Sequence, residues 1–237
     1  MRVGNLVRVV CLAVLCTTAG QVKAGMISAS DRGYYERSTF LPSTEIEPGY
    51  HSSNNLNYLA GSSTSSGYYN VSRNFFVFDL SGLSTSEIIT SASLRLKNSQ
   101  GTPSGNYTVY DVSTSIPDLT ADGSSGATFD DLGTGTSYGI RAMSSADDGT
   151  FVTINLNAAG LSALNVARGG FFATGGTFAV DGFAFNNSDN ILSDTSLVYE
   201  VSSGPAVPEP TTMVMFGIGA LGMGLVARRR KKHSNAQ

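Results

Sequence analysis

Hydrophobic and polar residues alternate with a period of two along several short stretches of the chain. In residues 90–96, Ala92, Leu94 and Leu96 share one face, while serines and Arg95 occupy the other. Successive side chains of a β-strand point to opposite sides, so this alternation predicts half-buried strands. The predicted strands are residues 74–80, 90–96, 107–112, 151–156, 170–173, 178–185 and 196–201.

One stretch has the spacing of a helix instead. Residues 158–166 place Leu161 and Leu164 on one face, and Asn157 precedes them as a predicted N-cap. Segments rich in Gly, Ser and Asp, notably 61–67 and 121–135, separate the strands and predict loops. This series of short strands separated by loops predicts an all-β fold, an antiparallel two-sheet sandwich of jelly-roll type with one short helix.

The C-terminal thirty residues follow a different pattern. Residues 211–227 carry no charge and are followed by five consecutive basic residues, 228–232. As a helix, this apolar stretch would extend ~25 Å, at the short end of what crosses the bilayer core, and the basic residues would hold the end in the cytoplasm. Pro208 and Pro210 keep the preceding chain extended, so Glu209 is presented just outside the membrane. On physical grounds alone, a permanent C-terminal anchor fits as well.

Three elements in this order resemble the PEP-CTERM sorting signal of Gram-negative bacteria. They are the motif Val207, Pro208, Glu209, Pro210, the Gly-rich apolar span, and the stop-transfer cluster Arg228, Arg229, Arg230, Lys231, Lys232. The resemblance implies processing by exosortase, a membrane-embedded, cysteine transpeptidase-like enzyme often encoded beside exopolysaccharide genes. It also implies that the anchor is transient and that cleavage falls near the motif.

The N-terminus has the pattern of a secretory signal peptide. Arg2 and Arg8 precede or begin a short apolar core, and Val22 and Ala24 have the small or aliphatic side chains of a cleavage site, so we expect cleavage after Ala24. The predicted organisation is a signal peptide (1–24), a β-sandwich domain (25–203), a linker with the motif (204–210), a transmembrane helix (211–227) and a basic cytoplasmic tail (228–237).

Charge and cysteine content narrow the function of the predicted domain. It holds seven basic and seventeen acidic residues, a formal charge of −10, which argues against nucleic acid as a partner. On this reasoning, an anionic polysaccharide would need a bridging cation. Both cysteines, Cys11 and Cys16, lie in the signal peptide, so the domain has neither a disulfide nor a cysteine metal site.

Few residues are candidates for chemistry. His51 is the domain's one histidine and would have to serve any Ser-His-Asp triad, but its surroundings predict a loop histidine. Calcium is the most plausible cofactor, as a structural ion in Gly-rich loops, although turn formation explains the same residues. The weak calcium candidates are Asp118, Asp122, Asp130, Asp131, Asp147 and Asp148. The side chains that could stack on a sugar ring are tyrosines, namely Tyr34, Tyr35, Tyr50, Tyr58, Tyr68 and Tyr69.

Residues 73–80, 89–96 and 108–112 resemble strands of the β-sandwich domains of other PEP-CTERM proteins and, more loosely, of jelly-roll carbohydrate-binding modules. We therefore expect a non-enzymatic protein without a required cofactor. It would pass through the inner membrane to the periplasm, cell surface or matrix, with a structural or adhesive role and possible contact with exopolysaccharide. The alternatives are a carbohydrate-binding module for a neutral glycan and, less favoured, a secreted glycoside hydrolase.

Overall fold

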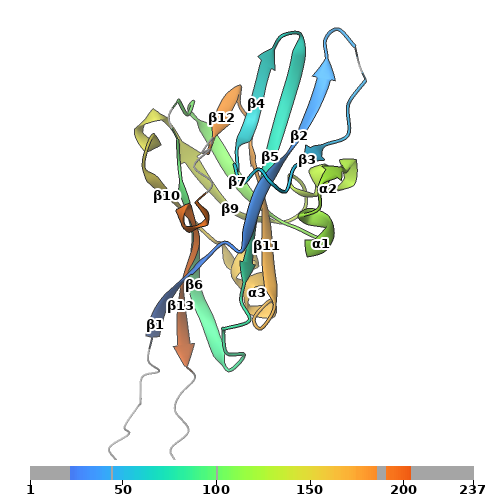
Figure 1. The fold of residues 1–237 in the computed structure, drawn as a ribbon. Coiled ribbons are helices and arrows are strands. Elements are labelled where there is room, and N and C mark those ends of the chain that lie inside the picture. The colour runs from blue at the N-terminus through green and yellow to red at the C-terminus, as the bar shows by residue number, and fades with distance from the viewer. Residues whose placement is uncertain (1–21, 44, 100, 186–190, 204–237) are drawn as a thin grey trace, which may run out of the picture. The chain divides into compact units, whose positions relative to one another are not determined.

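The computed structural model describes residues 22–43, 45–99, 101–185 and 191–203. Within them the chain forms two antiparallel sheets with a few short helices, which confirms the all-β class (Figure 1). The strands are β1 (Val22–Ser28), β2 (Asp31–Phe40), β3 (Tyr50–His51), β4 (Ala60–Ser65), β5 (Tyr68–Asp79), β6 (Glu87–Lys97), β7 (Gly105–Asp111), β8 (Gly123–Ser124), β9 (Ser137–Met143), β10 (Phe151–Asn155), β11 (Phe171–Phe178), β12 (Gly182–Ala184) and β13 (Thr195–Ser203). The helices are α1 (Ile116–Leu119), α2 (Gly126–Asp131) and α3 (Ala158–Val166), with 3-10 helices η1 (Ser145–Asp147) and η2 (Leu192–Asp194).

The smaller sheet, sheet A, has the strand order β1-β13-β6-β10. The larger, sheet B, has the order β8-β3-β2-β5-β11-β7-β9, and β4 and β12 pair beside β5. The last strand, β13, therefore lies inside sheet A, with Val22 opposite Ser202 on one side and Leu96 opposite Thr195 on the other. As a result, the start of β1 and the end of β13 lie at the same end of the body (Figure 1).

The main core fills the space between the two sheets. Sheet A contributes alternate residues of β6, β10 and β13, such as Leu94, Ile154 and Leu197, which are all buried. Sheet B contributes Phe76 and Phe78 of β5 together with aromatic residues of β7 and β11. The period-two pattern of the sequence is thus the pattern of inward side chains.

A second, smaller core covers the other face of sheet B. Phe75 and Val77 of β5 point away from sheet A and pack with Tyr35, Leu119 of α1 and Phe129 of α2. Both faces of β5 are therefore buried, which explains why its sequence reads as a continuous apolar run rather than an alternating one.

One cation is buried at the junction of the sheets. Arg32 of β2 is fully buried, and its guanidinium lies 4.4 Å from the centre of the Tyr58 ring. Its Nε donates to the carbonyl of Leu56 at 2.9 Å, and Nη1 donates to the hydroxyl of Thr195 at 2.7 Å. Because Thr195 begins β13, this buried hydrogen bond joins sheet B to the last strand of sheet A.

Helix α3 and its N-cap are confirmed, since Asn157 accepts from the backbone of Gly160 at 3.0 Å. Other predictions need correction. Residues 61–67 are mostly strand β4, because serines and threonines pair there with β5, and residues 121–135 contain α2 rather than only a loop. Residues 178–185 are the end of β11 and the separate strand β12. The pattern did not reveal strands β1, β2, β3, β8 and β9, which are polar, exposed or short.

The predicted cleavage after Ala24 falls inside β1. Cleavage there would leave Gly25–Ser28 opposite residues 196–199 of β13, so most of the pairing would remain. Among the described residues, no helix has the length and apolar character needed to span a bilayer. The predicted span, 211–227, lies outside the described residues, as do most of the signal peptide and the basic tail.

We expect Leu197→Ala to lower the free energy of unfolding by about 2–5 kcal/mol, because it leaves a cavity in the main core under β13. Val198→Ala is the matched control on the opposite face of the same strand, with an expected loss below about 1 kcal/mol. Urea denaturation of the two variants checks this. Equal losses would mean that β13 does not close the core as described.

Candidate functional site

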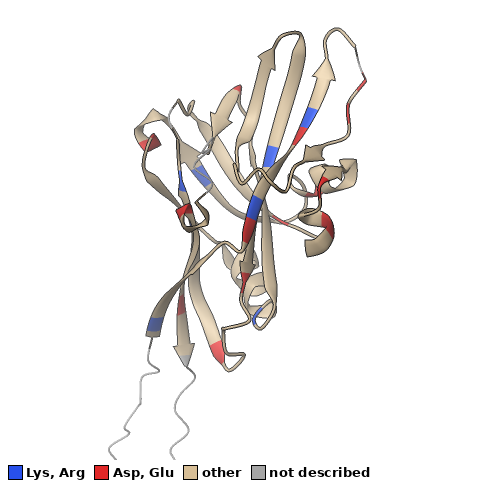
Figure 2. Ribbon diagram, in the orientation of Figure 1, with Lys and Arg blue, Asp and Glu red and all other residues tan. Residues whose placement is uncertain are grey.

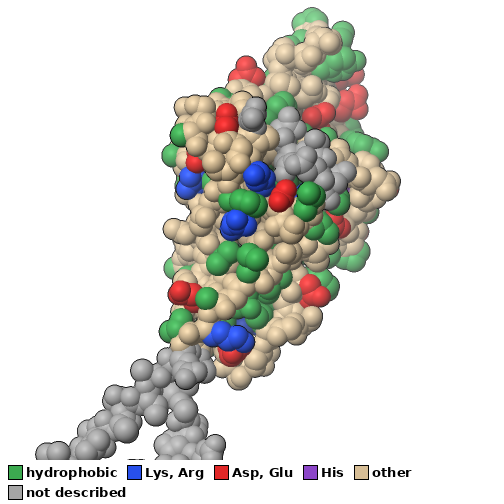
Figure 3. All heavy atoms as spheres, turned by 60° about the vertical axis from the view of Figure 1, so that its left-hand side comes forward, with side chains coloured by type: hydrophobic (Ala, Val, Ile, Leu, Met, Phe, Trp, Pro, Cys, Tyr) green, Lys and Arg blue, Asp and Glu red, His purple; other side chains and the backbone are tan. Residues whose placement is uncertain are grey.

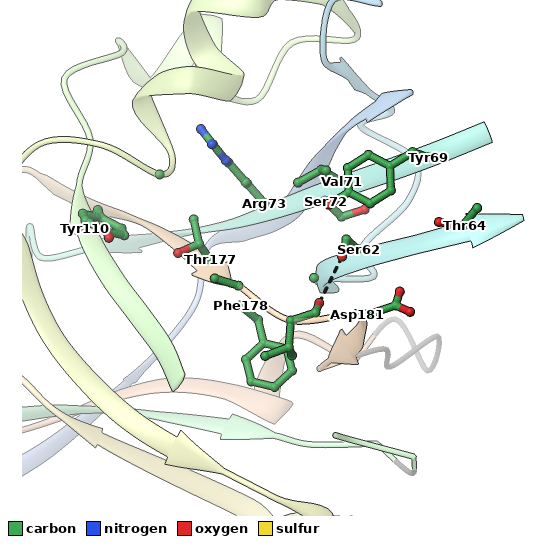
Figure 4. Close-up of a pocket in the computed structure, with 14 residues that line it drawn as sticks. Ser62, Thr64, Tyr69, Val71, Ser72, Arg73, Tyr110, Thr177, Phe178 and Asp181 are labelled. Atoms are coloured by element: carbon green, nitrogen blue, oxygen red, sulfur yellow. Dashed lines mark hydrogen bonds between the residues drawn. The ribbon is translucent and has the colours of Figure 1, made fainter. Parts of the chain in front are cut away.

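An open groove lies on the outer face of sheet B, beside α2 (Figure 4). Its volume is about 690 Å³, comparable with the volumes of small-molecule sites. Strands β4, β5, β7 and β11 form it, together with the turn after β11. The side chains that line it include Ser62, Thr64, Tyr69, Val71, Arg73, Tyr110, Thr177 and Asp181.

Tyr69 is the most exposed aromatic side chain of the groove, with 41% of its surface accessible. It lies near the end of β5 that pairs with β4, with Thr64 opposite it in register. The groove floor is closed by the hydroxyl of Ser62, which donates to the carbonyl of Val180 at 3.0 Å. Gly61 permits this close approach, because its φ is +141° and a Cβ would collide with the carbonyl of Gly182.

Arg73 lies toward the α2 end of the groove. Its guanidinium sits 4.3 Å from the centre of the Phe129 ring and donates to the carbonyls of Phe129 and Asp130 at 2.9 and 3.1 Å. Burial lowers the pKa of Arg73, whereas the carboxylate of Asp130, 3.8 Å away, raises it. Because this cation already has its partners, the groove suits an uncharged polar ligand better than an anion.

The six predicted tyrosines do not form one platform. Tyr35 and Tyr58 are buried in the two cores, and Tyr34 is half-buried. Tyr50 and Tyr68 are exposed but do not line the groove, so Tyr69 is the member that does. Tyr110 of β7 completes the lining of the groove. The sequence did not predict this role, because the pattern of β7 does not show that the outer face of sheet B is uncovered at Tyr110.

Residues 206–231 match the model of the PEP-CTERM protein-sorting motif. The chain thus carries a PEP-CTERM sorting motif. The match confirms the resemblance seen in the sequence and includes the Pro208-Glu209-Pro210 tripeptide, the apolar span and the start of the basic cluster. The motif implies an exported protein that passes the cell envelope, associates with the membrane through its C-terminus and is processed by exosortase. No curated protein matches the chain.

The six candidate aspartates lie on short helices or in turns, with Asp118 on α1, Asp130 and Asp131 on α2, and Asp147 on η1. Most of them accept hydrogen bonds from backbone or hydroxyl groups nearby. Asp131 accepts four bonds from Ser113 and Thr114, which lowers its pKa despite partial burial. Asp130 pairs with Arg37 at 2.9 Å and Asp147 with Arg141 at 2.7 Å.

The remaining three aspartates also have local partners. Asp148 accepts from the backbone of Gly101 and Thr102, Asp122 from the backbone of Ser53, and Asp118 from the hydroxyl of Ser115. Asp118 and Asp122 line one shallow hollow, but no group of three metal-binding side chains exists among the described residues. The calcium hypothesis thus stays a prediction without a shared site.

His51 lies in a buried aromatic stack rather than in an exposed loop. Its ring is 5.1 Å from the rings of both Tyr35 and Phe75, and Nδ1 lies 3.0 Å from the carbonyl oxygen of Tyr34. Burial lowers the pKa of His51, although the Tyr34 carbonyl, Asp31 and Asp122 oppose this shift. The neutral ring with Nδ1–H as donor fits this site, so the geometry assigns His51 a packing role.

The lowered pKa of His51 predicts a pH dependence of stability. Between its folded pKa and about 6.5 the unfolded chain binds the proton and the folded chain does not, so stability should fall as the pH drops below about 6.5 toward the folded pKa. Thermal melts should show that His51→Gln reduces this slope. His233→Gln, which changes the other histidine, should leave it unchanged; equal slopes in all three proteins would contradict the assignment.

Proposed function

We propose that this chain is a non-enzymatic surface or matrix protein with a structural or adhesive role. The observation that carries the proposal is the sorting motif at 206–231, three residues after the last strand of the folded body. The predicted signal peptide, 1–24, and the basic cluster, 228–232, both place the body outside the cytoplasm. Its route would be the inner membrane, then the periplasm, cell surface or extracellular matrix.

The proposal also covers the membrane helix, the connections of the sandwich and the partner of the mature form. Residues 211–227 would cross the membrane as a transient helix until exosortase cuts near Glu209. The sandwich would have jelly-roll connections, which is supported by the way the chain alternates between sheets: β1, β6, β10 and β13 are in sheet A, with sheet B strands between them. Exopolysaccharide is the partner proposed for the mature form.

Two observations support a role without catalysis. The ring of His51 is held in an aromatic stack with Tyr35, and its Nδ1 lies 3.0 Å from the carbonyl oxygen of Tyr34. The candidate aspartates have structural partners, as Asp130 and Asp131 show. A glycoside hydrolase using paired carboxylates remains the less favoured alternative.

A second candidate function, binding of a neutral glycan, is favoured by the groove on sheet B. Tyr69 offers an exposed ring for stacking, and Thr64, Thr177 and Asp181 supply hydroxyl and carboxylate groups around it. Sugar rings present apolar C–H faces and polar rims, which match this combination. Such a site would make the protein a carbohydrate-binding module.

We expect Glu209→Ala to block exosortase processing, because the acidic side chain between two prolines is the polar feature of the motif. Fractionation of cells with and without an exosortase checks this. In exosortase-positive cells the variant should stay in the membrane fraction at precursor size. If the variant were processed and located like the wild type, the sorting proposal would be wrong.

We expect Tyr69→Ala to weaken binding of a neutral oligosaccharide by about threefold to tenfold, since one stacking contact is worth about 0.5–1.5 kcal/mol. Tyr68→Ala is the matched control, because Tyr68 is similarly exposed but packs against Phe40, with ring centres 5.2 Å apart. A neutral glycan array, followed by titration of any hit, gives the measurement. Equal effects of both changes would argue against the groove.

A further inference from the structure

Two basic side chains share one aromatic ring on the outer face of sheet A. Arg95 and Lys97 lie on β6, and Phe151 lies on the neighbouring edge strand β10. The guanidinium carbon of Arg95 is 3.4 Å, and the ammonium nitrogen of Lys97 is 5.1 Å, from the centre of the Phe151 ring. The face that Figure 3 turns forward carries several basic side chains, with hydrophobic and acidic side chains among them.

The two cations differ from the five other basic residues of the predicted domain, 25–203. Arg37 and Arg73 pair with Asp130, Arg141 pairs with Asp147, and Arg168 donates to the carbonyls of Asn165 and Thr85. Arg32 is buried among its partners. Within the part of the chain that the structure describes, the side chains of Arg95 and Lys97 take part in no ion pair and donate no hydrogen bond.

The positive charges of Arg95 and Lys97 repel each other, so holding them close together costs free energy. The Phe151 ring offsets part of this cost, because its negative face attracts both cations and holds them at the surface. Phe151 itself is 37% exposed, so the ring is open to solvent as well. An anionic group placed between Arg95 and Lys97 would relieve the repulsion and find two preoriented donors.

The surface beside the cations continues as a polar row. Ser93 and Ser91 follow Arg95 along the same face of β6, with Asn155 opposite Ser93. A hollow of about 360 Å³ opens there, lined in part by Ser93, Asn155 and Val198. From Ser91 to Lys97 the row spans ~20 Å of strand, at ~3.3 Å per residue. Acidic groups are present too: Asp194 precedes β13, and Glu200 accepts from Ser91 at 2.9 Å.

We propose that this row binds an anionic polysaccharide directly, with Arg95 and Lys97 holding a carboxylate or sulfate group and the hydroxyl and amide groups beside them contacting neighbouring sugar hydroxyls. The acidic body had suggested that a bridging cation would be necessary, but net charge does not reveal two unpaired cations on one face. The proposal goes beyond the sorting and adhesive roles. The proposed site lies on sheet A, whereas the groove proposed for a neutral glycan lies on sheet B.

The test is binding of the full chain, in a neutral detergent, to polygalacturonate, dextran sulfate and uncharged dextran. We expect both anionic polymers to bind and dextran not to bind. Arg95→Gln with Lys97→Gln should weaken binding at least tenfold, and Phe151→Leu should weaken it several-fold. Raising NaCl from about 0.1 M to about 1 M should weaken wild-type binding, because the Debye length falls from ~10 to ~3 Å.

The matched control removes two positive charges elsewhere. Arg229→Gln with Arg230→Gln changes the basic tail and should alter affinity less than twofold. Charge-conserving Lys97→Arg should retain binding. Weaker binding of polygalacturonate relative to dextran sulfate would identify sulfate as the preferred group and support the proposal.

Three results would overturn the proposal. The first is unchanged affinity in the Arg95 and Lys97 double variant, and the second is loss of affinity through the tail variant instead. The third is a double variant that self-associates while keeping its affinity, since this would show that the cations only protect the edge of sheet A, where β10 is the outermost strand. Circular dichroism melts of each variant establish that it is folded.

Discussion

Sheet A depends on the strand that comes last in the chain. β13 is hydrogen-bonded to β1 on one side and to β6 on the other, so without it β1 has no neighbour in that sheet. Its inward residues Leu197 and Val201 belong to the main core, and Thr195 receives the buried hydrogen bond of Arg32. Closure of the body therefore requires the segment that leads directly into the sorting motif at 206–231.

The second organising feature is the unequal covering of the two sheets. Helices α1 and α2 cover one part of the outer face of sheet B over Phe75 and Val77, and the groove lies beyond them, where β4 and β5 extend the sheet. The outer face of sheet A instead carries exposed residues such as Phe151. The surfaces available for ligands are thus the parts of the sheets that no helix packs against. Binding functions on such rigid strands need little rearrangement of the backbone.

The sequence predicts the strands whose two faces differ, such as β6, and the helix whose first turn is capped by Asn157. It fails for β4, because Ser62 and its neighbours have no apolar alternation and are ordered by pairing with β5 and β12. It also fails for His51, which looks like a loop residue until the long-range stack with Tyr35 and Phe75 is known. The groove and the paired cations arise from contacts between strands, which a local pattern does not contain. The sorting motif was predictable because it is contiguous.

Charge explains how one acidic body can present two different surfaces. Basic residues are few, and most lie on strands (Figure 2). Arg37 and Arg73 fix α2 to sheet B through Phe129 and Asp130, so their charges are already partnered within the protein. Arg95 and Lys97 are held only by an aromatic ring, which leaves their charge available. The sign of a local surface therefore follows from how each cation is partnered, which the formal charge of −10 for the whole domain does not show.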